Sequence, residues 1–252
     1  MIALRLRRSA VAIALLPLAL GLAACDKKAD DAGGLSGEPV AKIAAPAGKA
    51  WADVVAETPD GGVLLGNPAA PIKVIEYGSL SCPHCAKLAQ DGFAKLRDDY
   101  IASGRVSLEF RSFAIHPQDV PLTLLARCGG LETYFPQVEQ IYANFDALNA
   151  PLADQAVQVK ANAAMQAAPE QRMNAISEAL GYTQFFAARG IAVEQARSCL
   201  ANEAKAQQIA GFAQKYTEEG ITGTPALLLN GANLNTTEWN VLEAALQKAG
   251  AR

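Results

Sequence analysis

The 252-residue chain has very little histidine and only one CxxC motif, and both features argue against a metal site. His84 and His116 are its two histidines, and the paired cysteines are Cys82 and Cys85. A structural zinc site takes four sulfur or nitrogen ligands, which this set does not supply. The chain also has no Gly-rich phosphate loop. We therefore expect no metal and no nucleotide cofactor.

An excess of positive charge is also lacking. Lysine and arginine number 22 against 25 acidic residues, for a formal net charge of −3. Residues 1–24 hold three arginines and no acid, so without them the balance is 19 minus 25, or −6. A mildly acidic surface gives no support for nucleic-acid binding. The low aromatic content, 6%, together with abundant alanine favours helix.

The N-terminus has the pattern of an export signal. Three arginines precede an apolar run from Ala10 to about Leu22, which is short for a membrane span. The tetrapeptide Leu22–Cys25 resembles the lipobox of bacterial lipoproteins. We predict a signal peptide over residues 1–24 and a lipid anchor on Cys25, with an ordinary cleaved signal as the alternative. Two or three acyl chains would hold the protein on a membrane, and the acidic residue after the cysteine favours the inner one.

The segments before and after the motif predict a strand, a helix and a second strand. Residues 25–50 are rich in charge, glycine, alanine and proline without periodicity, so we predict a flexible tether there. Ile72 to about Tyr77 is rich in β-branched residues and predicts a strand. An amphipathic helix and the alternating strand "RVSLEFRSFAI" follow. This order predicts a parallel βαβ unit with a right-handed crossover.

The second half of the chain changes from helical to strand character. Residues 117–216 have helical periodicity and predict an all-helical insertion. In "GTPALLLNGANL" the pair Asn230-Gly231 predicts a hairpin turn, and a last helix follows. We therefore predict an α/β fold of the order βαβ, helical insertion, ββα, in which residues 51–116 and 217–252 form one domain.

The CxxC pair has three possible roles: metal ligands, a structural disulfide or chemically reactive thiols. The missing ligands oppose the first. A disulfide across two intervening residues closes too short a loop to remove much chain entropy, which opposes the second. A chemical reaction of the two thiols is therefore the remaining explanation for Cys82 and Cys85.

The local sequence supports a reactive thiolate. If a helix begins at the motif, Cys82 occupies the N-cap and Pro83 the first helical position, which proline favours. Backbone N–H groups and the positive end of the helix dipole then lower the pKa of Cys82. A protonated His84 would add positive charge. We predict Cys82 as the nucleophile and the more enclosed Cys85 as the resolving thiol.

These motifs resemble those of the DsbA-type thiol-disulfide oxidoreductases. The resemblance rests on CPHC after an apolar strand, an acid six residues before the first cysteine, a helical block, and a late Gly-Thr-Pro strand. It covers roughly residues 60 to 252 in order and spacing. The resemblance implies a thioredoxin-like fold with an inserted helical domain, and a redox-active cysteine pair as the only redox group.

The resemblance also implies roles for single residues. Cys82 would be the substrate-linked cysteine and Cys85 its partner. Pro225 would form a cis peptide bond beside the motif, and Thr224 and Pro225, together with Pro83, would contact a substrate peptide. A trans proline at a strand edge is the default without the family.

The family also has an acid beneath the active site that assists proton transfer, and Glu76 matches it. An exposed strand glutamate is the alternative, which alternation along the strand does not exclude. His116 has no matching role, and we expect it in a loop.

Cys128 and Cys199 lie 71 residues apart in the helical block. In an oxidising compartment a structural disulfide between them is the natural expectation, and some family members have such a bridge. Two free buried thiols are the alternative. With Cys25 lipidated, the pairing leaves none of the five cysteines over.

These features together predict an exported, lipid-anchored oxidase on the periplasmic side of a bacterial membrane. It would donate disulfides to reduced exported proteins, act as a monomer, and be reoxidised by a DsbB-like membrane protein that passes electrons to quinone. The main alternative is a periplasmic reductase or isomerase, which the Pro-His dipeptide opposes. A copper or assembly chaperone that uses Cys82, His84 and Cys85 as soft ligands is the alternative from another class.

Overall fold

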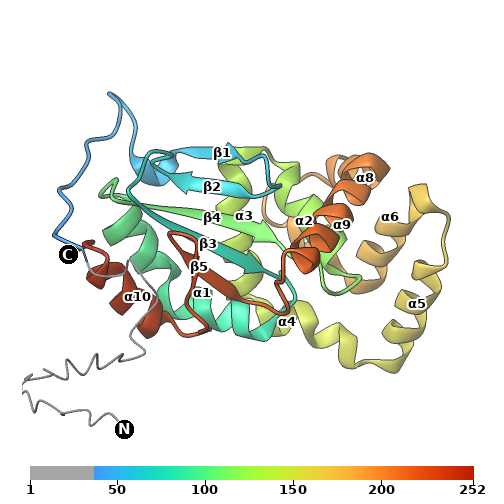
Figure 1. The fold of residues 1–252 in the computed structure, drawn as a ribbon. Coiled ribbons are helices and arrows are strands. Elements are labelled where there is room, and N and C mark those ends of the chain that lie inside the picture. The colour runs from blue at the N-terminus through green and yellow to red at the C-terminus, as the bar shows by residue number, and fades with distance from the viewer. Residues whose placement is uncertain (1–36) are drawn as a thin grey trace, which may run out of the picture. The chain divides into compact units, whose positions relative to one another are not determined.

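The computed structural model describes residues 37–252 (Figure 1). The predicted signal peptide over residues 1–24 and the lipidation site Cys25 lie outside the described residues and stay predictions. None of the helices found within residues 37–252 combines the length and the apolar character that a membrane crossing needs.

A six-stranded mixed sheet organises the fold, with strand order β1-β2-β4-β3-β5-β6. The central strands β3 and β4 are parallel, and every other neighbouring pair is antiparallel. The strands are β1 (Val55–Glu57), β2 (Val63–Gly66), β3 (Ile72–Gly78), β4 (Val106–Ser112), β5 (Ala226–Leu229) and β6 (Ala232–Asn233). The predicted parallel βαβ unit is therefore confirmed, and the carboxyl ends of β3 and β4 meet at one edge, where Gly78 lies opposite Ser112.

The last two strands form the predicted hairpin. Asn230 and Gly231 separate β5 from β6, and both have positive φ, 50° and 86°. A two-residue turn of this kind matches the twist of the strands that it joins, and asparagine and glycine tolerate its backbone conformation. The turn places β6 beside β5, and the other edge of β5 pairs with β3 in the register Tyr77 opposite Ala226.

Helices fill the rest of the fold and lie mostly between β4 and β5 in the sequence. α1 follows β3, and a π-helical segment, Leu96–Ile101, continues directly from its end. The α-helices are α1 (Pro83–Lys95), α2 (Asp119–Cys128), α3 (Leu131–Ala143), α4 (Phe145–Asn149), α5 (Gln155–Met165), α6 (Pro169–Leu180), α7 (Tyr182–Ala187), α8 (Val193–Leu200), α9 (Glu203–Glu218) and α10 (Trp239–Lys248). Figure 1 shows α2, α5, α6, α8 and α9 beyond one end of the sheet, and α3 beside its strands.

One hydrophobic core joins the inserted helices to the sheet. Its fully buried members include Val74 and Leu108 from the sheet, Leu125 of α2, Tyr134 of α3 and Phe186 of α7. Burial of each such side chain stabilises the fold by about 1.5 to 3 kcal/mol. The inserted helices therefore pack as an extension of the core around the sheet.

The two faces of β3 pack against different helices, because successive side chains of a strand point to opposite faces. Ile72 and Val74 belong to the main core on the side of α1 and α3. Ile75 and Tyr77 belong to a smaller cluster with Tyr216 of α9. Glu76 shares the face of Val74 and is therefore directed into the main core.

The prediction of a flexible tether over residues 25–50 is wrong for part of its described length. The backbone N–H of Gly37 donates to the Lys248 carbonyl (2.8 Å), that of Val40 to the Gly250 carbonyl (2.9 Å) and that of Ile43 to the Ser103 carbonyl (2.9 Å). These partners are more than fifty residues away in the sequence, so no local sequence pattern predicts the contacts. The bonds attach residues 37–43 to the folded domain.

Candidate active site

The CPHC motif lies where β3 ends and α1 begins, at the carboxyl edge of the parallel strands. Cys82 is the N-cap residue of α1, with extended φ and ψ of −88° and 125°, and Pro83 is the first helical residue, as predicted. Pro83 and His84 are exposed, whereas Cys82 and Cys85 are 5% and 0% exposed. Both cysteines are free thiols in the structure. At the start of the helix, the two central residues of the motif are therefore exposed to solvent, and the two sulfurs are shielded from it.

The surroundings of Cys82 favour a thiolate. A hydrogen bond from the Cys85 thiol is the largest cause that lowers the pKa of Cys82, to about 5, against the opposing effect of burial. The Thr224 side chain and the backbone N–H groups of Cys85 and His84 lower it further. These N–H groups make no full capping bond to the sulfur, so we read their effect as that of dipoles directed at it. The imidazole of His84 lies exposed, and its predicted charge effect stays a prediction.

Thr224 is placed to interact with both forms of the Cys82 sulfur. The protonated thiol donates to the Thr224 carbonyl oxygen at 3.4 Å. The Thr224 hydroxyl has no hydrogen-bond partner in the described part of the chain. It is therefore free to donate to the thiolate, which is consistent with its lowering of the pKa.

Cys85 has the opposite electrostatic environment. Burial is the largest cause that raises the pKa of Cys85 well above its ordinary value, and its hydrogen bond to Cys82 and the charge of Glu76 add to the rise. A hydrogen bond from the Ser79 backbone opposes them. Two adjacent thiols thus differ strongly in acidity, which is the arrangement that thiol-disulfide exchange needs, with one ready nucleophile and one protonated partner.

Glu76 is buried beneath the motif, which excludes the alternative of an exposed strand glutamate. Its side chain is directed between α1 and α3, among Phe93, Phe135 and Tyr142. Its Oε1 has no hydrogen-bond partner in residues 37–252. Burial, followed by the negative charge of Cys82, raises the pKa of Glu76 to about 8. Its part in proton transfer stays a prediction.

The Thr224–Pro225 peptide bond is cis and lies directly before β5, beside the Cys82 sulfur. An open groove of about 520 Å³ adjoins it, lined by residues 220–226, Asn233 and residues 235–238. The antiparallel pairing of β5 with β3 brings this late segment to the motif. Substrate contact by Thr224, Pro225 and Pro83 stays a prediction.

A polar network next to the motif was missed by the sequence reasoning. Asp119, the first residue of α2, is 1% exposed and accepts hydrogen bonds from Ser79 and Ser81, which lie just before Cys82. His116 lies in a loop, as predicted, but its Nδ1 is 3.0 Å from the Ser81 hydroxyl. A lone aspartate at a helix start is an ordinary surface feature, so the sequence carried no signal for this contact.

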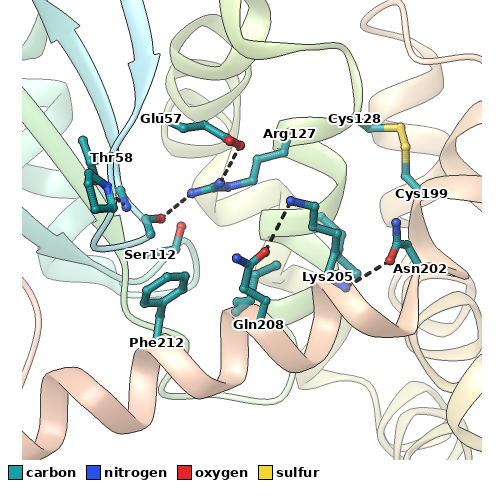
Figure 2. A pocket seen from close by; sticks show the side chains of 15 residues that line it. Glu57, Thr58, Ser112, Arg127, Cys128, Cys199, Asn202, Lys205, Gln208 and Phe212 are labelled. Carbon is teal, nitrogen blue, oxygen red and sulfur yellow. Dashed lines mark hydrogen bonds and ion pairs between the residues drawn. A yellow bond between two sulfur atoms is a disulfide. The ribbon is translucent and has the colours of Figure 1, made fainter.

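The structure joins Cys128 and Cys199 in a disulfide, as predicted. The bridge forms part of the wall of a cavity of about 410 Å³ between the β1–β2 turn, α2 and α9 (Figure 2). Arg127 of α2 extends into this cavity toward Glu57 (3.5 Å) and donates to the Gly61 carbonyl (2.7 Å). No residue of the CPHC motif lines the cavity, so the bridge is separate from the Cys82 and Cys85 thiols.

The described residues hold no cluster of three or more histidine, cysteine, aspartate or glutamate side chains arranged to bind a metal ion. Comparisons with known proteins identify the family of the chain. A family profile described as thioredoxin matches residues 58–248. A Rickettsia conorii protein that bears the provisional name protein-disulfide oxidoreductase is 28% identical over 191 residues. That match covers 75% of this chain and 61% of the relative, so the chain spans less than two thirds of that protein.

Solved structures show the same fold. The protein-disulfide isomerase from Novosphingobium aromaticivorans superposes with a TM-score of 0.68 at 26% identity, over 73% of this chain and 94% of that one. Wolbachia pipientis alpha-DsbA1 superposes with a TM-score of 0.61 at 21% identity, over 77% and 93% of the two chains. Since the family profile covers most of the sequence, the chain belongs to the thioredoxin family, and its fold is that of the DsbA-type proteins.

Proposed function

We propose that the protein is an exported, lipid-anchored thiol-disulfide oxidoreductase that donates the Cys82–Cys85 disulfide to newly exported proteins. The observation that carries this proposal is the lowered pKa of Cys82, about 5, next to a Cys85 whose pKa is raised well above its ordinary value. A stabilised thiolate favours the reduced enzyme. The corresponding disulfide is then a strong oxidant.

The reaction balances as a two-electron transfer from a substrate dithiol to the cysteine pair. A substrate thiolate attacks the Sγ of Cys82, the Cys82–Cys85 bond breaks, and Cys85 leaves and takes up a proton. Glu76, with a pKa of about 8, is protonated near neutral pH and is a suitable donor for it. The second substrate thiolate then attacks the substrate sulfur of the mixed disulfide. Cys82 leaves as a thiolate, the substrate is oxidised and the enzyme is reduced.

Substrate binding and turnover follow from the same proposal. An extended substrate segment would lie along Thr224 and Pro225, with the exposed Pro83 on its other side, where its sulfur can reach Cys82. Turnover requires an oxidant for the reduced pair, and a DsbB-like, quinone-linked membrane protein has that chemistry. A lipid anchor on Cys25 would hold a monomeric enzyme near this partner, with the inner membrane favoured.

A reductase or isomerase is the second candidate. The observation in its favour is the structural likeness to the Novosphingobium aromaticivorans protein, which is named a protein-disulfide isomerase. An isomerase needs a reduced Cys82 thiolate at steady state, whereas a donor needs an oxidised pair. The reduction potential separates a donor from a reductase, and refolding assays separate a donor from an isomerase.

The test is the midpoint potential of the pair in glutathione buffers, read with a thiol-reactive mass tag on the chain from residue 26 onward. A Cys128→Ala/Cys199→Ala variant is the control, because its tags count only Cys82 and Cys85. The proposal expects a midpoint toward about −120 mV, the reference for a strong disulfide donor, rather than about −270 mV, the reference for thioredoxin. A midpoint at the thioredoxin end would contradict donation and favour the reductase. Refolding assays with reduced and with scrambled ribonuclease then separate oxidation from isomerisation.

A further inference from the structure

The carboxylate of Asp119 makes a dense set of hydrogen bonds behind the reactive cysteines. Oδ1 accepts from the Ser79 hydroxyl (2.9 Å) and the Ser81 backbone N–H (3.0 Å). Oδ2 accepts from the Ser79 hydroxyl (3.0 Å) and the His116 backbone N–H (2.9 Å). The side chain is 1% exposed, so water does not compete for these bonds. One buried group thus connects the start of α2 to the loop before Cys82.

The segment that Asp119 holds is short and is fixed at several other points. Tyr142 of α3 donates its hydroxyl to the Ser79 carbonyl (3.1 Å), and the Cys82 backbone N–H donates to the same oxygen (3.2 Å). The Gly78 carbonyl accepts from the Phe113 N–H (2.8 Å). Since the peptide unit is planar, this bond orients the Ser79 N–H on the opposite side. The loop from Ser79 to Cys82 is therefore held at its hydroxyl, amide and carbonyl groups.

The Ser79 N–H has a chemical use in this position. It lowers the pKa of the Cys85 thiol, against the larger opposing effect of burial, and so favours negative charge on that sulfur. Cys85 is the leaving group when a substrate thiolate attacks Cys82, and its negative charge develops in a buried place. A fixed backbone donor there stabilises the developing thiolate and costs no reorganisation.

We propose that Asp119 is a positioning residue for thiol-disulfide exchange. Through Ser79 and Ser81 it holds the loop that keeps Cys82 at the start of α1 and directs the Ser79 N–H at the Cys85 sulfur. The inference rests on the proposed exchange at Cys82 and Cys85. It adds a residue from the helical insertion to the machinery of the thioredoxin-like domain.

A purely electrostatic role for Asp119 makes the opposite prediction. A nearby negative charge disfavours a thiolate, so its removal would lower the pKa of Cys82. Loss of positioning would raise that pKa, because Cys82 would lose its alignment with the Cys85 thiol and the first-turn N–H groups. The charged groups around Asp119 include His116, whose Nδ1 lies 3.6 Å from Oδ2 and is able to pair with it. The direction of the shift therefore separates the two roles.

The decisive variant is Asp119→Asn. The amide keeps one oxygen but presents an NH₂ group to the N–H donor of Ser81 or His116, so the loop loses part of its support. Thiolate absorbance of the reduced chain, followed against pH, should show the Cys82 transition shifted upward by about one unit. That shift is the tenfold change expected for the loss of one hydrogen bond. The rate at which glutathione opens the Cys82–Cys85 disulfide should fall by about tenfold, because the Cys85 leaving group loses its donor.

Asn67→Ala is the matched control. Asn67 is also buried, and it fixes the loop before β3 through bonds to the Gly104 carbonyl (2.9 Å) and the Ala69 N–H (3.0 Å). This variant should lose stability without a change in either cysteine measurement. If Asp119→Asn does not fold, Ser79→Ala removes the hydroxyl and keeps the backbone, and should shift the transition in the same upward direction by a smaller amount.

An unchanged or lowered Cys82 transition in Asp119→Asn, or an equal shift in Asn67→Ala, would overturn the positioning role. Both measurements use the wild-type chain as reference, so they also separate this inference from the proposed function. If glutathione does not open the disulfide of the wild-type chain, the exchange itself fails. If the wild-type chain reacts and Asp119→Asn reacts equally fast, only the role of Asp119 fails.

Discussion

The replacement of Glu76 by glutamine should stabilise the reduced protein, and increasingly so as the pH rises. Glu76 is 8% exposed, and its Oε1 has no partner in the described part of the chain. Burial, and after it the charge of Cys82, raises the pKa of Glu76 from 4.5 to about 8. Glutamine has nearly the same shape and carries no charge at any pH, so the comparison isolates the ionisation.

The magnitude follows from the linkage between protonation and unfolding. Between pH 4.5 and about 8 the folded state keeps the Glu76 proton while the unfolded chain releases it. The Glu76 contribution to the free energy of unfolding is therefore fully present below pH 4.5 and is lost as the pH rises through about 8. The loss is about 1.4 kcal/mol per pH unit, or about 3 kcal/mol at neutral pH and about 5 kcal/mol in total. The Glu76→Gln variant should not show this loss of free energy of unfolding.

The difference between the two proteins must be measured, because Cys82 acts in the opposite direction. The pKa of Cys82 is lowered from 9 to about 5, so its contribution grows as the pH rises between these values. Both proteins contain this contribution, and it largely cancels in the difference. Urea unfolding of the reduced chains at steps between about pH 5 and pH 8 gives that difference.

Glu170→Gln, an exposed change in the first turn of α6, is the control and should show a flat difference. The reasoning is refuted if the difference between Glu76→Gln and the wild-type chain stays constant over this pH range, or if the variant becomes less stable as the pH rises.

Three further predictions concern the cysteines and one close packing contact. Iodoacetamide at about pH 6 should alkylate Cys82 and spare Cys85, because the pKa of Cys82 is about 5 and that of Cys85 is raised; equal labelling in peptide maps would contradict this. Joint replacement of Cys128 and Cys199 by alanine should lower the free energy of unfolding by about 4 kcal/mol in urea titrations, since the bridge closes a long loop; a loss below about 1 kcal/mol would contradict it. Gly92→Ala should cost about 2 kcal/mol in the same assay, because the added methyl would overlap the indole that begins α10.

Gly211→Ala is the matched control for the glycine change. Gly211 also lies inside a helix, α9, but an added methyl group there meets no other atom within 4 Å. Alanine should stabilise that helix by up to about 1 kcal/mol. If both variants change stability in the same direction, the contact beneath Gly92 is not the cause of the stability change in Gly92→Ala.

Local sequence was sufficient to predict the secondary structure around the cysteine motif. The β-branched run of β3, the proline after Cys82 and the spacing to Cys85 are short-range patterns, and short-range rules of strand formation and helix capping act on them. The turn at Asn230-Gly231 is of the same kind, because its conformation depends on the two residues themselves. In each case the structure confirms the prediction.

The residues that surround the motif depended on contacts between distant parts of the chain. Whether Glu76 is exposed or buried was open until the packing of α1 and α3 over β3 placed it in the core. The attachment of residues 37–43 likewise depends on the carbonyl groups of Ser103, Lys248 and Gly250, so composition alone wrongly indicated a tether.

The sequence by itself determined that Cys82 lies at the start of a helix and Cys85 in its first turn, because this arrangement depends only on the residues of that turn. The tertiary structure decided how acidic each thiol is, since burial, the Ser79 amide and the Thr224 side chain act on the sulfurs through space. It also decided that Asp119, thirty-seven residues beyond Cys82, supports the loop before it. Electrostatic interactions and hydrogen bonds depend on distance in space, and the fold alone sets that distance.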